Sequence, residues 1–232
     1  MSELEPLMDA LADFAAGAGH EINNPLAIIS GHAQILLKST KTPEEQRHLA
    51  AILAQVKRAY EMIADIRSFS RPPEPVLTIF NLTDFFNQIQ ADYQSPSVLF
   101  SAAVTIDWQK ETLPPNERNL SADSQLLRSV FDALIRNATE AGEFGKTEII
   151  ISPASALHET GKRYWKIYVE DNGPGIPAEI RKQIFFPYFS GREFGRGLGF
   201  GLPRSWAIMK KMGGSLSLDP QTEKNRFLVE LF

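Results

Sequence analysis

Cysteine is absent from this chain of 232 residues, so disulfide bonds and thiolate metal sites are excluded. Long apolar runs are missing too, because stretches such as 26–30 and 148–151 fall far short of the ~20 residues that cross a bilayer. The amino terminus has no signal-peptide pattern. These absences predict a cytoplasmic protein without a membrane segment.

An excess of basic residues is also missing. The chain has 24 Lys and Arg residues against 28 Asp and Glu residues, which gives a net charge of −4. We therefore expect no broad basic surface and no nucleic-acid partner. The hydrophobic content of 43% is nevertheless ample for one large domain or two modest domains with buried cores.

The first third of the chain has the pattern of two amphipathic helices joined by a short polar loop. Apolar residues recur every three or four positions from 11 to 36 and again from 49 to 66. Thr42-Pro43-Glu44-Glu45 predicts a capping box at the start of the second helix, and the prolines at 72, 73 and 75 end it. A lone hairpin buries two such stripes poorly, so we predict that two copies pair into a four-helix bundle. The alternative is that the hairpin docks on the rest of its own chain.

The motif GHEINNPL, at 19–26, interrupts the apolar pattern of the first helix. His20 lies between the stripe positions 18 and 22, so its ring is predicted to face outward. Pro25 lacks a backbone donor and clashes with the preceding turn, which predicts a bend just after the polar cluster. HEINN lacks the second histidine of HExxH, so zinc is not expected. The other histidines have no such polar neighbours and are predicted to be surface residues: His32, His48 and His158.

Beyond residue 75 the pattern changes to mixed α and β. Helices are predicted at 81–93, 123–141, 177–185 and 202–212. Strands are predicted within 98–108 and at 148–152, 164–170, 215–218 and 227–232. This order predicts an α+β sandwich in which helices cover one face of a sheet.

Three segments of this region have residue types suited to ligand binding. Asp171-Asn172-Gly173-Pro174-Gly175 follows a predicted strand, so its aspartate is a fixed acceptor beside a tight turn; taken alone, it is most often an ordinary turn. Glycines alternate at 195–201 before a predicted helix, so that backbone N–H groups can converge on phosphate; the alternative is a flexible loop. Asn137, late in another predicted helix, can equally be a satisfied cap.

These segments, in this order, resemble the catalytic core of sensor histidine kinases, in the nitrogen-regulator-like subgroup whose phosphorylation motif reads HEINNPL. The resemblance also includes the FFPYF segment at 185–189 and covers nearly the whole chain. It implies a helical hairpin for dimerisation and histidine phosphotransfer at 1–75. It implies an ATP-binding sandwich, of the type shared with gyrase and Hsp90, at 76–232.

The resemblance implies ATP and Mg²⁺ as cofactors. Asp171 would hold the adenine amino group, Gly173 and Gly175 would shape its pocket, and Asn137 would help to coordinate Mg²⁺. Residues 190–201 would form a lid over the phosphates, with an arginine at 192 where the family usually has lysine. The lid residues expected to contact the nucleotide are Arg192, Gly197, Gly199 and Gly201.

For phosphoryl transfer, the resemblance implies that His20 attacks the γ-phosphate while Glu21 accepts the proton from the other ring nitrogen. Asn24, one turn further along the same face, would orient a water that hydrolyses the phosphoryl-aspartate of a response regulator. The alternative for Asn24 is a structural role near the carbonyls freed by Pro25. The implied partners are a second copy of the chain, a response-regulator receiver domain and an upstream sensor protein or domain.

Two departures from the family pattern concern the metal and the phosphorylated helix. Ala133 stands where the family often has a second metal-assisting asparagine, and Gly19 replaces alanine beside His20. The implied function is an ATP-dependent histidine kinase that also acts as a phosphatase. One rival is a phosphotransfer or scaffold protein with an inactive nucleotide site. Another is an ATPase of the same fold that drives a conformational clamp without a phosphohistidine.

Overall fold

The computed structural model describes residues 4–94, 102–142, 147–158, 160–189, 199–220, 222 and 224–232. For residues 4–5, 7–9, 12–13 and 15–20 it describes the backbone and not the side chains. The chain forms two compact units, Met1–Pro72 and Pro73–Phe232. Within the described residues, no helix combines the length and the hydropathy that a membrane crossing requires.

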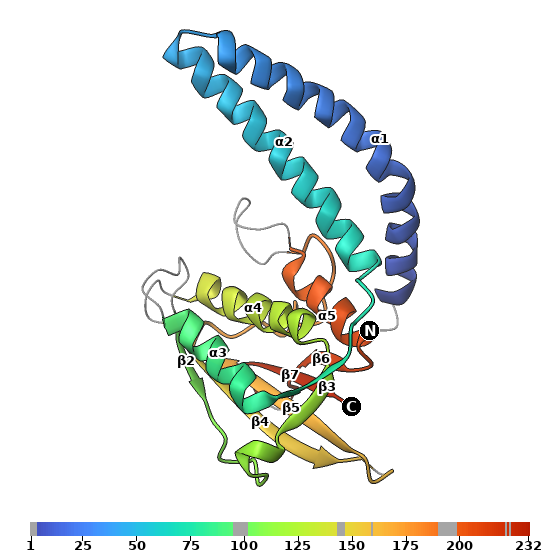
Figure 1. Cartoon of the computed structure of the whole chain (residues 1–232), viewed down its shortest axis with the longest axis vertical. Helices are drawn as coiled ribbons and strands as arrows, with labels where there is room; N and C mark the ends of the chain where they lie inside the picture. Colours follow the sequence, from blue (N-terminus) through green and yellow to red (C-terminus); the bar gives the residue numbers. More distant parts are fainter. Residues whose placement is uncertain are drawn as a thin grey trace. The chain divides into compact units, whose positions relative to one another are not determined.

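The first unit is a hairpin of two long helices, α1 (Leu4–Ser39) and α2 (Pro43–Ser70), which lie side by side in Figure 1. The predicted cap of the second helix is confirmed, because the Thr42 hydroxyl accepts a hydrogen bond from the Glu45 N–H at 3.4 Å. The Glu45 carboxylate in turn accepts bonds from the hydroxyls of Thr40 and Thr42. This closed cap fixes where the chain reverses direction.

Helix α1 continues through Pro25 and is curved, as Figure 1 shows, in agreement with the effect expected of an internal proline. Tyr60 of α2 reaches across the hairpin near this point, where its hydroxyl donates to the backbone carbonyl of Asn23 at 3.4 Å. The curved part of α1 is therefore tied to α2 by a polar contact as well as by packing.

The apolar stripes of the hairpin are only partly covered. Ala33 and Val56 are buried, but Ile29 and Ile52 keep 47% and 44% of their surface exposed. A shallow groove runs along this face and is lined by Leu26, Ile29, His48, Ala51, Ile52, Gln55 and Val56. Exposed apolar side chains gathered along a groove between two helices are typical of an interaction site.

The second unit is built on a five-stranded sheet in the order β2-β4-β5-β7-β6. β2 runs parallel to β4, and the other neighbouring pairs are antiparallel. The strands of this sheet are β2 (Ala103–Ile106), β4 (Glu148–Leu157), β5 (Arg163–Asp171), β6 (Ser215–Leu218) and β7 (Asn225–Leu231). Burial alternates along β5 and β7, so each strand presents one face to the core.

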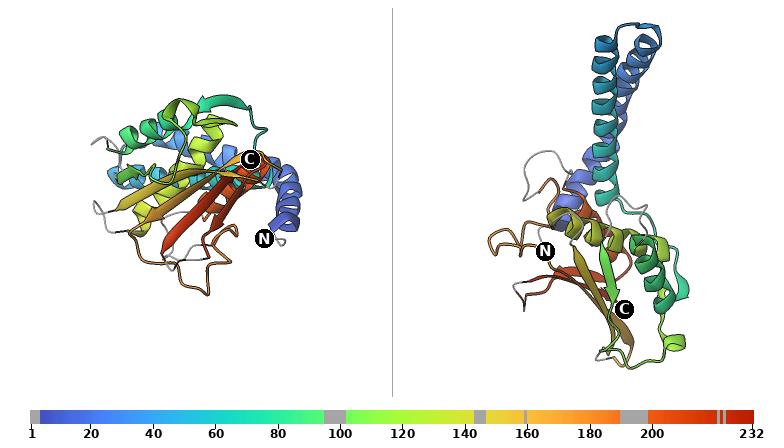
Figure 2. Two further views of the ribbon diagram at one scale, coloured as in Figure 1. Left: turned by 90° about the horizontal axis from the view of Figure 1, so that it is seen from below. Right: turned by 90° about the vertical axis from the view of Figure 1, so that its left-hand side faces the viewer.

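Three helices lie on one face of this sheet, as the views in Figures 1 and 2 agree: α3 (Leu82–Gln94), α4 (Ser124–Ala141) and α5 (Gly201–Lys211). The predicted α+β sandwich is confirmed. Aromatic rings join α3 to α4, since the rings of Phe86 and Phe131 meet edge to face at 5.1 Å. The predicted helices at 81–93, 123–141 and 202–212 correspond to these three within a few residues.

Two parts of this unit differ from the sequence prediction. The helix predicted at 177–185 is wrong: the chain there makes successive turns, in which Ile180 N donates to Pro177 O and Gln183 N to Ile180 O. A small antiparallel sheet of β1 (Thr78–Asn81) and β3 (Asn119–Ala122), with the 3₁₀ turn η1 (Pro115–Glu117), was not predicted. Its strands have only four residues each, too few to establish a periodic pattern. Residues 98–101, where part of a strand region was predicted, lie outside the described residues.

Candidate nucleotide-binding site

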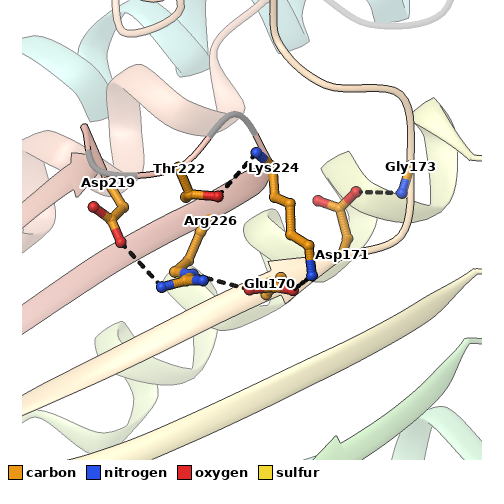
Figure 3. A network of polar contacts seen from close by, with 7 residues as sticks. All are labelled: Glu170, Asp171, Gly173, Asp219, Thr222, Lys224 and Arg226. Atoms are coloured by element: carbon orange, nitrogen blue, oxygen red, sulfur yellow. Dashed lines mark hydrogen bonds and ion pairs between the residues drawn. The ribbon is translucent and has the colours of Figure 1, made fainter.

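The candidate site is centred on Asp171, the last residue of β5, which is only 8% exposed. Its Oδ1 accepts two hydrogen bonds, from the Gly173 N–H at 2.8 Å and from Asn225 Nδ2 at 3.0 Å. Figure 3 shows the first of these contacts at the end of the strand. Both bonds fall on the same oxygen, so in the described part of the chain Oδ2 remains available as an acceptor for a ligand.

The turn that follows Asp171 is held tightly against the carboxylate. A Cβ added at Gly173 would lie 2.6 Å from Asp171 Oδ1, a distance that requires either a glycine or a displaced carboxylate. Asn225 Nδ2 also donates to the Pro174 carbonyl at 2.7 Å, and Asn172 Oδ1 accepts from the Glu148 N–H at 2.9 Å. Hydrogen bonds thus attach the turn to β4 and β7, the two strands that flank β5.

Burial is the main influence on the charge of Asp171 and raises the pKa of its carboxyl. The hydrogen bonds from Asn225 and from the Gly173 N–H act in the opposite direction, and the nearby Glu170 charge raises the pKa again. The net pKa is above the usual value for aspartate. Protonation would place a hydrogen on one of the two oxygens, so the donors around Asp171 help to keep both oxygens as acceptors.

Glu170 is held by an ion-pair network (Figure 3). Its carboxylate accepts from Lys224 Nζ at 2.7 Å and from Arg226 Nε at 2.9 Å, and Arg226 also contacts Asp219 at 3.3 Å. Burial raises the pKa of Glu170, but the bonds from Lys224 and Arg226 outweigh it and leave the pKa lowered. Lys224 and the start of β7 are therefore anchored to the end of β5 beside Asp171.

Asn137, the predicted metal-assisting residue, lies in the carboxyl-terminal half of α4 and is partly exposed. The helix that carries it begins at a strong cap, because Asp123 Oδ1 accepts from the backbone N–H groups of Gln125 and Leu126 at 3.0 and 2.9 Å. Ala133, four residues before Asn137, is buried. Among the described residues, no group of three or more His, Asp or Glu side chains is placed to hold a metal.

The glycine-rich segment is described in part. Gly199 has φ +70°, and a Cβ there would lie 2.6 Å from the Phe189 carbonyl oxygen, so its glycine is required by the fold itself. Gly201, the first residue of α5, has open space where a Cβ would stand. Gly175 lies exposed in the turn after Asp171. Arg192 and Gly197 lie outside the described residues.

In the helical unit, the HEINNPL motif lies within α1. Glu21 and Asn24 are exposed, while the orientation predicted for the His20 ring lies outside the described side chains. The prediction that the other histidines are surface residues is confirmed, since His32, His48 and His158 are exposed.

Asn225 is a residue of the candidate site that the sequence analysis missed. It pairs directly with Asp171 in the register of β5 and β7 and is buried, although it lies 54 positions further along the chain. The last strand was predicted to start at 227, which left Asn225 outside it. A polar residue at the start of an alternating apolar strand was the available signal, but only the strand pairing reveals which carboxylate it faces.

The two units match two protein families. Residues 122–231 match the family described as histidine kinase-, DNA gyrase B-, and HSP90-like ATPase, and residues 10–75 match the His Kinase A (phospho-acceptor) domain.

Curated relatives span most of this chain. Sporulation kinase C of Bacillus subtilis is 28% identical over 92% of this chain and 46% of its own length. The signal transduction histidine-protein kinase AtoS of Escherichia coli is 30% identical over 87% of this chain and 31% of its own length. The sensory histidine kinase/phosphatase NtrB of Rhodobacter capsulatus is 31% identical over 91% of this chain and 59% of its own length. The chain thus spans about half the length, or less, of the first two of these relatives.

Solved structures share the fold. Full-length ShkA, in complex with AMPPNP, gives a TM-score of 0.67 at 21% identity over 95% of this chain and 45% of that chain. The histidine kinase ThkA, in complex with the response regulator TrrA, gives 0.61 at 22% identity over 95% of this chain and 61% of that chain. A His Kinase A phospho-acceptor domain is followed here by a histidine kinase-type ATPase domain, and named histidine kinases match nearly the whole chain. The chain therefore contains the catalytic core of a sensor histidine kinase.

Proposed function

We propose that this chain is an ATP-dependent protein histidine kinase that phosphorylates His20 and passes the phosphoryl group to an aspartate of a response regulator. The observation that carries the proposal is the buried Asp171 carboxylate, with one oxygen bonded to its own turn and the other available. The HEINNPL motif on α1 supports the second half of the proposal, because it places a histidine beside a carboxylate on the phospho-acceptor hairpin.

The residues at the end of β5 fit a purine. Asp171 Oδ2 suits the exocyclic amino group of adenine, and the turn at Gly173 has no side chain that would separate a flat ring from the carboxylate. Gly175 would extend that surface. The open space at Gly201, at the amino terminus of α5, suits an approach by phosphate to backbone N–H groups.

When bound, ATP supplies the γ-phosphoryl group and Mg²⁺ offsets the charge of its phosphates. His20, as a neutral imidazole, would form the nitrogen–phosphorus bond through one ring nitrogen while the bond from the γ-phosphorus to the bridging oxygen breaks and ADP leaves. The proton on the other ring nitrogen would pass to Glu21, whose carboxylate is exposed and would orient the ring. Asn137 would hold Mg²⁺ from α4, and Arg192, Gly197, Gly199 and Gly201 would surround the phosphates.

The reverse direction of signalling is proposed for the same helix. Asn24 is exposed one turn beyond His20, where its amide can orient a water for hydrolysis of the phosphoryl-aspartate of the partner. The relatives named as kinase and phosphatase support this second activity. The Asn24→Ala variant should keep autophosphorylation and lose most of the dephosphorylation of a phosphorylated receiver domain.

The functional division proposed for the chain is 1–75 for dimerisation and phosphotransfer and 76–232 for catalysis. A homodimer is proposed because the hairpin leaves apolar positions such as Ile29 and Ile52 about half exposed along one groove. Pairing with a second hairpin would complete a four-helix bundle and cover that groove. A sensor protein or domain upstream would supply the signal.

The kinase proposal is tested by incubating the full chain with γ-labelled ATP and Mg²⁺. We expect protein-bound label that is stable in alkali and labile in acid, and that is absent from His20→Gln and from Asn137→Ala. No label on the wild-type chain, or label that persists in His20→Gln, would refute the proposal. Release of free phosphate without any phosphoprotein would favour the clamp-type ATPase, and phosphorylation only by another kinase would favour the scaffold.

A further inference from the structure

Asn225 makes contacts that fix its orientation. Its Nδ2 donates to Asp171 Oδ1 at 3.0 Å and to the Pro174 carbonyl at 2.7 Å. Both partners are acceptors, so rotating the amide by half a turn would place its oxygen against two other oxygens. The side chain is 4% exposed, which leaves it no alternative position in solvent.

The other end of this amide lacks a partner. Asn225 Oδ1 is buried and accepts no hydrogen bond from any residue that the structure describes. A buried acceptor without a partner costs about 1–3 kcal/mol, and such groups in native proteins require an explanation. A ligand or a buried water can supply the donor for this oxygen.

The side chains of Asp171 and Asn225 extend from paired positions of neighbouring strands. Each has one atom engaged in the contact between them and one oxygen without a bond in the described residues. Two oxygens that only accept hydrogen bonds suit a ligand edge rich in N–H donors. The 6-amino group of adenine has two such hydrogens, whereas a 6-oxo purine presents another acceptor there.

We propose that Asn225 is a positioning residue of the nucleotide site, which holds the Asp171 carboxylate and the turn at 172–175 in the geometry that selects a 6-amino purine. This inference rests on the proposed function and assigns a residue to it. The bond to Pro174 positions the turn, and the bond to Asp171 leaves Oδ2 directed to the ligand.

Arg181 makes two further hydrogen bonds next to this turn. Arg181 donates through Nε to the Ile176 carbonyl at 3.0 Å and through Nη1 to the Thr222 carbonyl at 3.1 Å. Asn225 therefore attaches the turn to β7, and Arg181 attaches Ile176, just after the turn, to Thr222. Asn225 alone also touches the carboxylate that reads the base.

The pH dependence of ATP binding reports the ionisation of Asp171. It should not change if Asn225 has only a structural role. Glu170, on the same strand, is the charged side chain among the described residues that acts on the pKa of Asp171; Asn225 and the Gly173 N–H are uncharged donors that lower it. Adenine binding needs the ionised carboxylate, so it should weaken as the pH falls through the pKa of Asp171. Removing the Asn225 donor should raise that pKa and move the loss to higher pH.

The experiment measures the affinities of the full chain for ATP and for inosine triphosphate, with Mg²⁺, as a function of pH. Inosine triphosphate has the same phosphates but a 6-oxo group, so the ratio of the two affinities cancels the titration of the phosphates. For Asn225→Leu we expect about a tenfold fall in ATP affinity, a smaller ATP preference and a shift of its pH dependence to higher pH. For Asn225→Asp we expect a larger fall near neutral pH, because a second carboxylate replaces the donor.

Val229→Ala is the matched control, since Val229 is fully buried on β7 but pairs with Ile167 and Leu216 rather than with Asp171. It should lower the melting temperature and leave the ratio and its pH dependence unchanged. If Asn225→Leu behaves like Val229→Ala, or keeps the wild-type ratio, the inference is wrong although the chain binds ATP. If the wild-type chain binds neither nucleotide, the proposed function itself fails.

Discussion

The helical hairpin and the sandwich differ in how completely they bury their apolar side chains. The sandwich encloses its core within one chain, with Phe86, Phe131, Ile149 and Phe227 almost inaccessible. The hairpin leaves Ile29 and Ile52 about half exposed along a groove. A site inside the sandwich can be preorganised by its own hydrogen bonds, whereas the proposed phospho-acceptor lies on a helix whose apolar stripe is only partly covered within one chain. Nucleotide recognition and dimerisation should therefore respond to different substitutions.

The largest effect is expected from a charge placed in the groove of the hairpin. Ile29→Asp should raise the dissociation constant of the dimer by at least about 100-fold, because carrying a carboxylate into an apolar interface costs several kcal/mol. Sedimentation equilibrium measures this directly. ATP binding, which belongs to the other unit, should change little.

The matched control for that variant is Ile28→Asp, one residue away. Ile28 is 62% exposed and does not line the groove. We expect it to leave the dimer intact. Equal dissociation by both variants would show that the groove is not the interface.

A smaller but still large effect is expected at Asp171, the carboxylate proposed to bind adenine. Asp171→Asn should weaken ATP binding about 10- to 100-fold, the range expected for a hydrogen bond to a charged group. The dimer should persist, which is the reverse of the result expected for Ile29→Asp. Calorimetric titration with ATP and Mg²⁺ measures the change, and wild-type affinity in the variant would remove Asp171 from the site.

Two glycine-to-alanine substitutions compare a position without room for a methyl group, Gly173, with a position that has room, Gly201. In Gly173→Ala the added methyl group meets Asp171 Oδ1 at 2.6 Å, so the carboxylate must move and ATP affinity should fall about tenfold. Gly201→Ala adds a methyl group to open space, so the melting temperature should not fall. A lower melting temperature in Gly201→Ala would show that this glycine serves the fold and would weaken its proposed role beside phosphate.

The smallest effect concerns the cap of α4. Asp123→Ala removes the acceptor for Gln125 and Leu126 and should lower the free energy of unfolding by about 1 kcal/mol. Hydrogen bonds from the backbone of Leu126 and Val76 lower the pKa of Asp123 below its usual value. The stabilisation from ionised Asp123 is therefore complete above the unfolded-state pKa and is lost as the pH falls through the lower folded-state pKa.

Urea denaturation at several pH values tests the cap. Asp123→Asn keeps a capping oxygen but cannot ionise, so it should lose less stability than Asp123→Ala and remove this part of the acid dependence. An unchanged acid dependence in Asp123→Asn would assign it to other carboxyl groups.

Local sequence signals were sufficient for much of the fold. The capping box at Thr42, the prolines after α2 and the apolar spacing of α4 and α5 act within a few residues, so their consequences were predictable. The prediction of a helix at 177–185 was wrong. The turns found there are held by a distant contact, in which Arg181 donates a hydrogen bond to the Thr222 carbonyl. Propensity within a short window does not include that contact.

By itself, the sequence determined the order of the motifs, the two-part organisation and the residue types available for phosphoryl transfer, because these depend on neighbours along the chain. Only the tertiary structure decided that Asp171 faces Asn225, since the pairing of β5 with β7 joins residues 54 positions apart. It also decided that one carboxylate oxygen is engaged and the other available. Hydrogen bonds and desolvation act through space, and no spacing of residues along the chain specifies them.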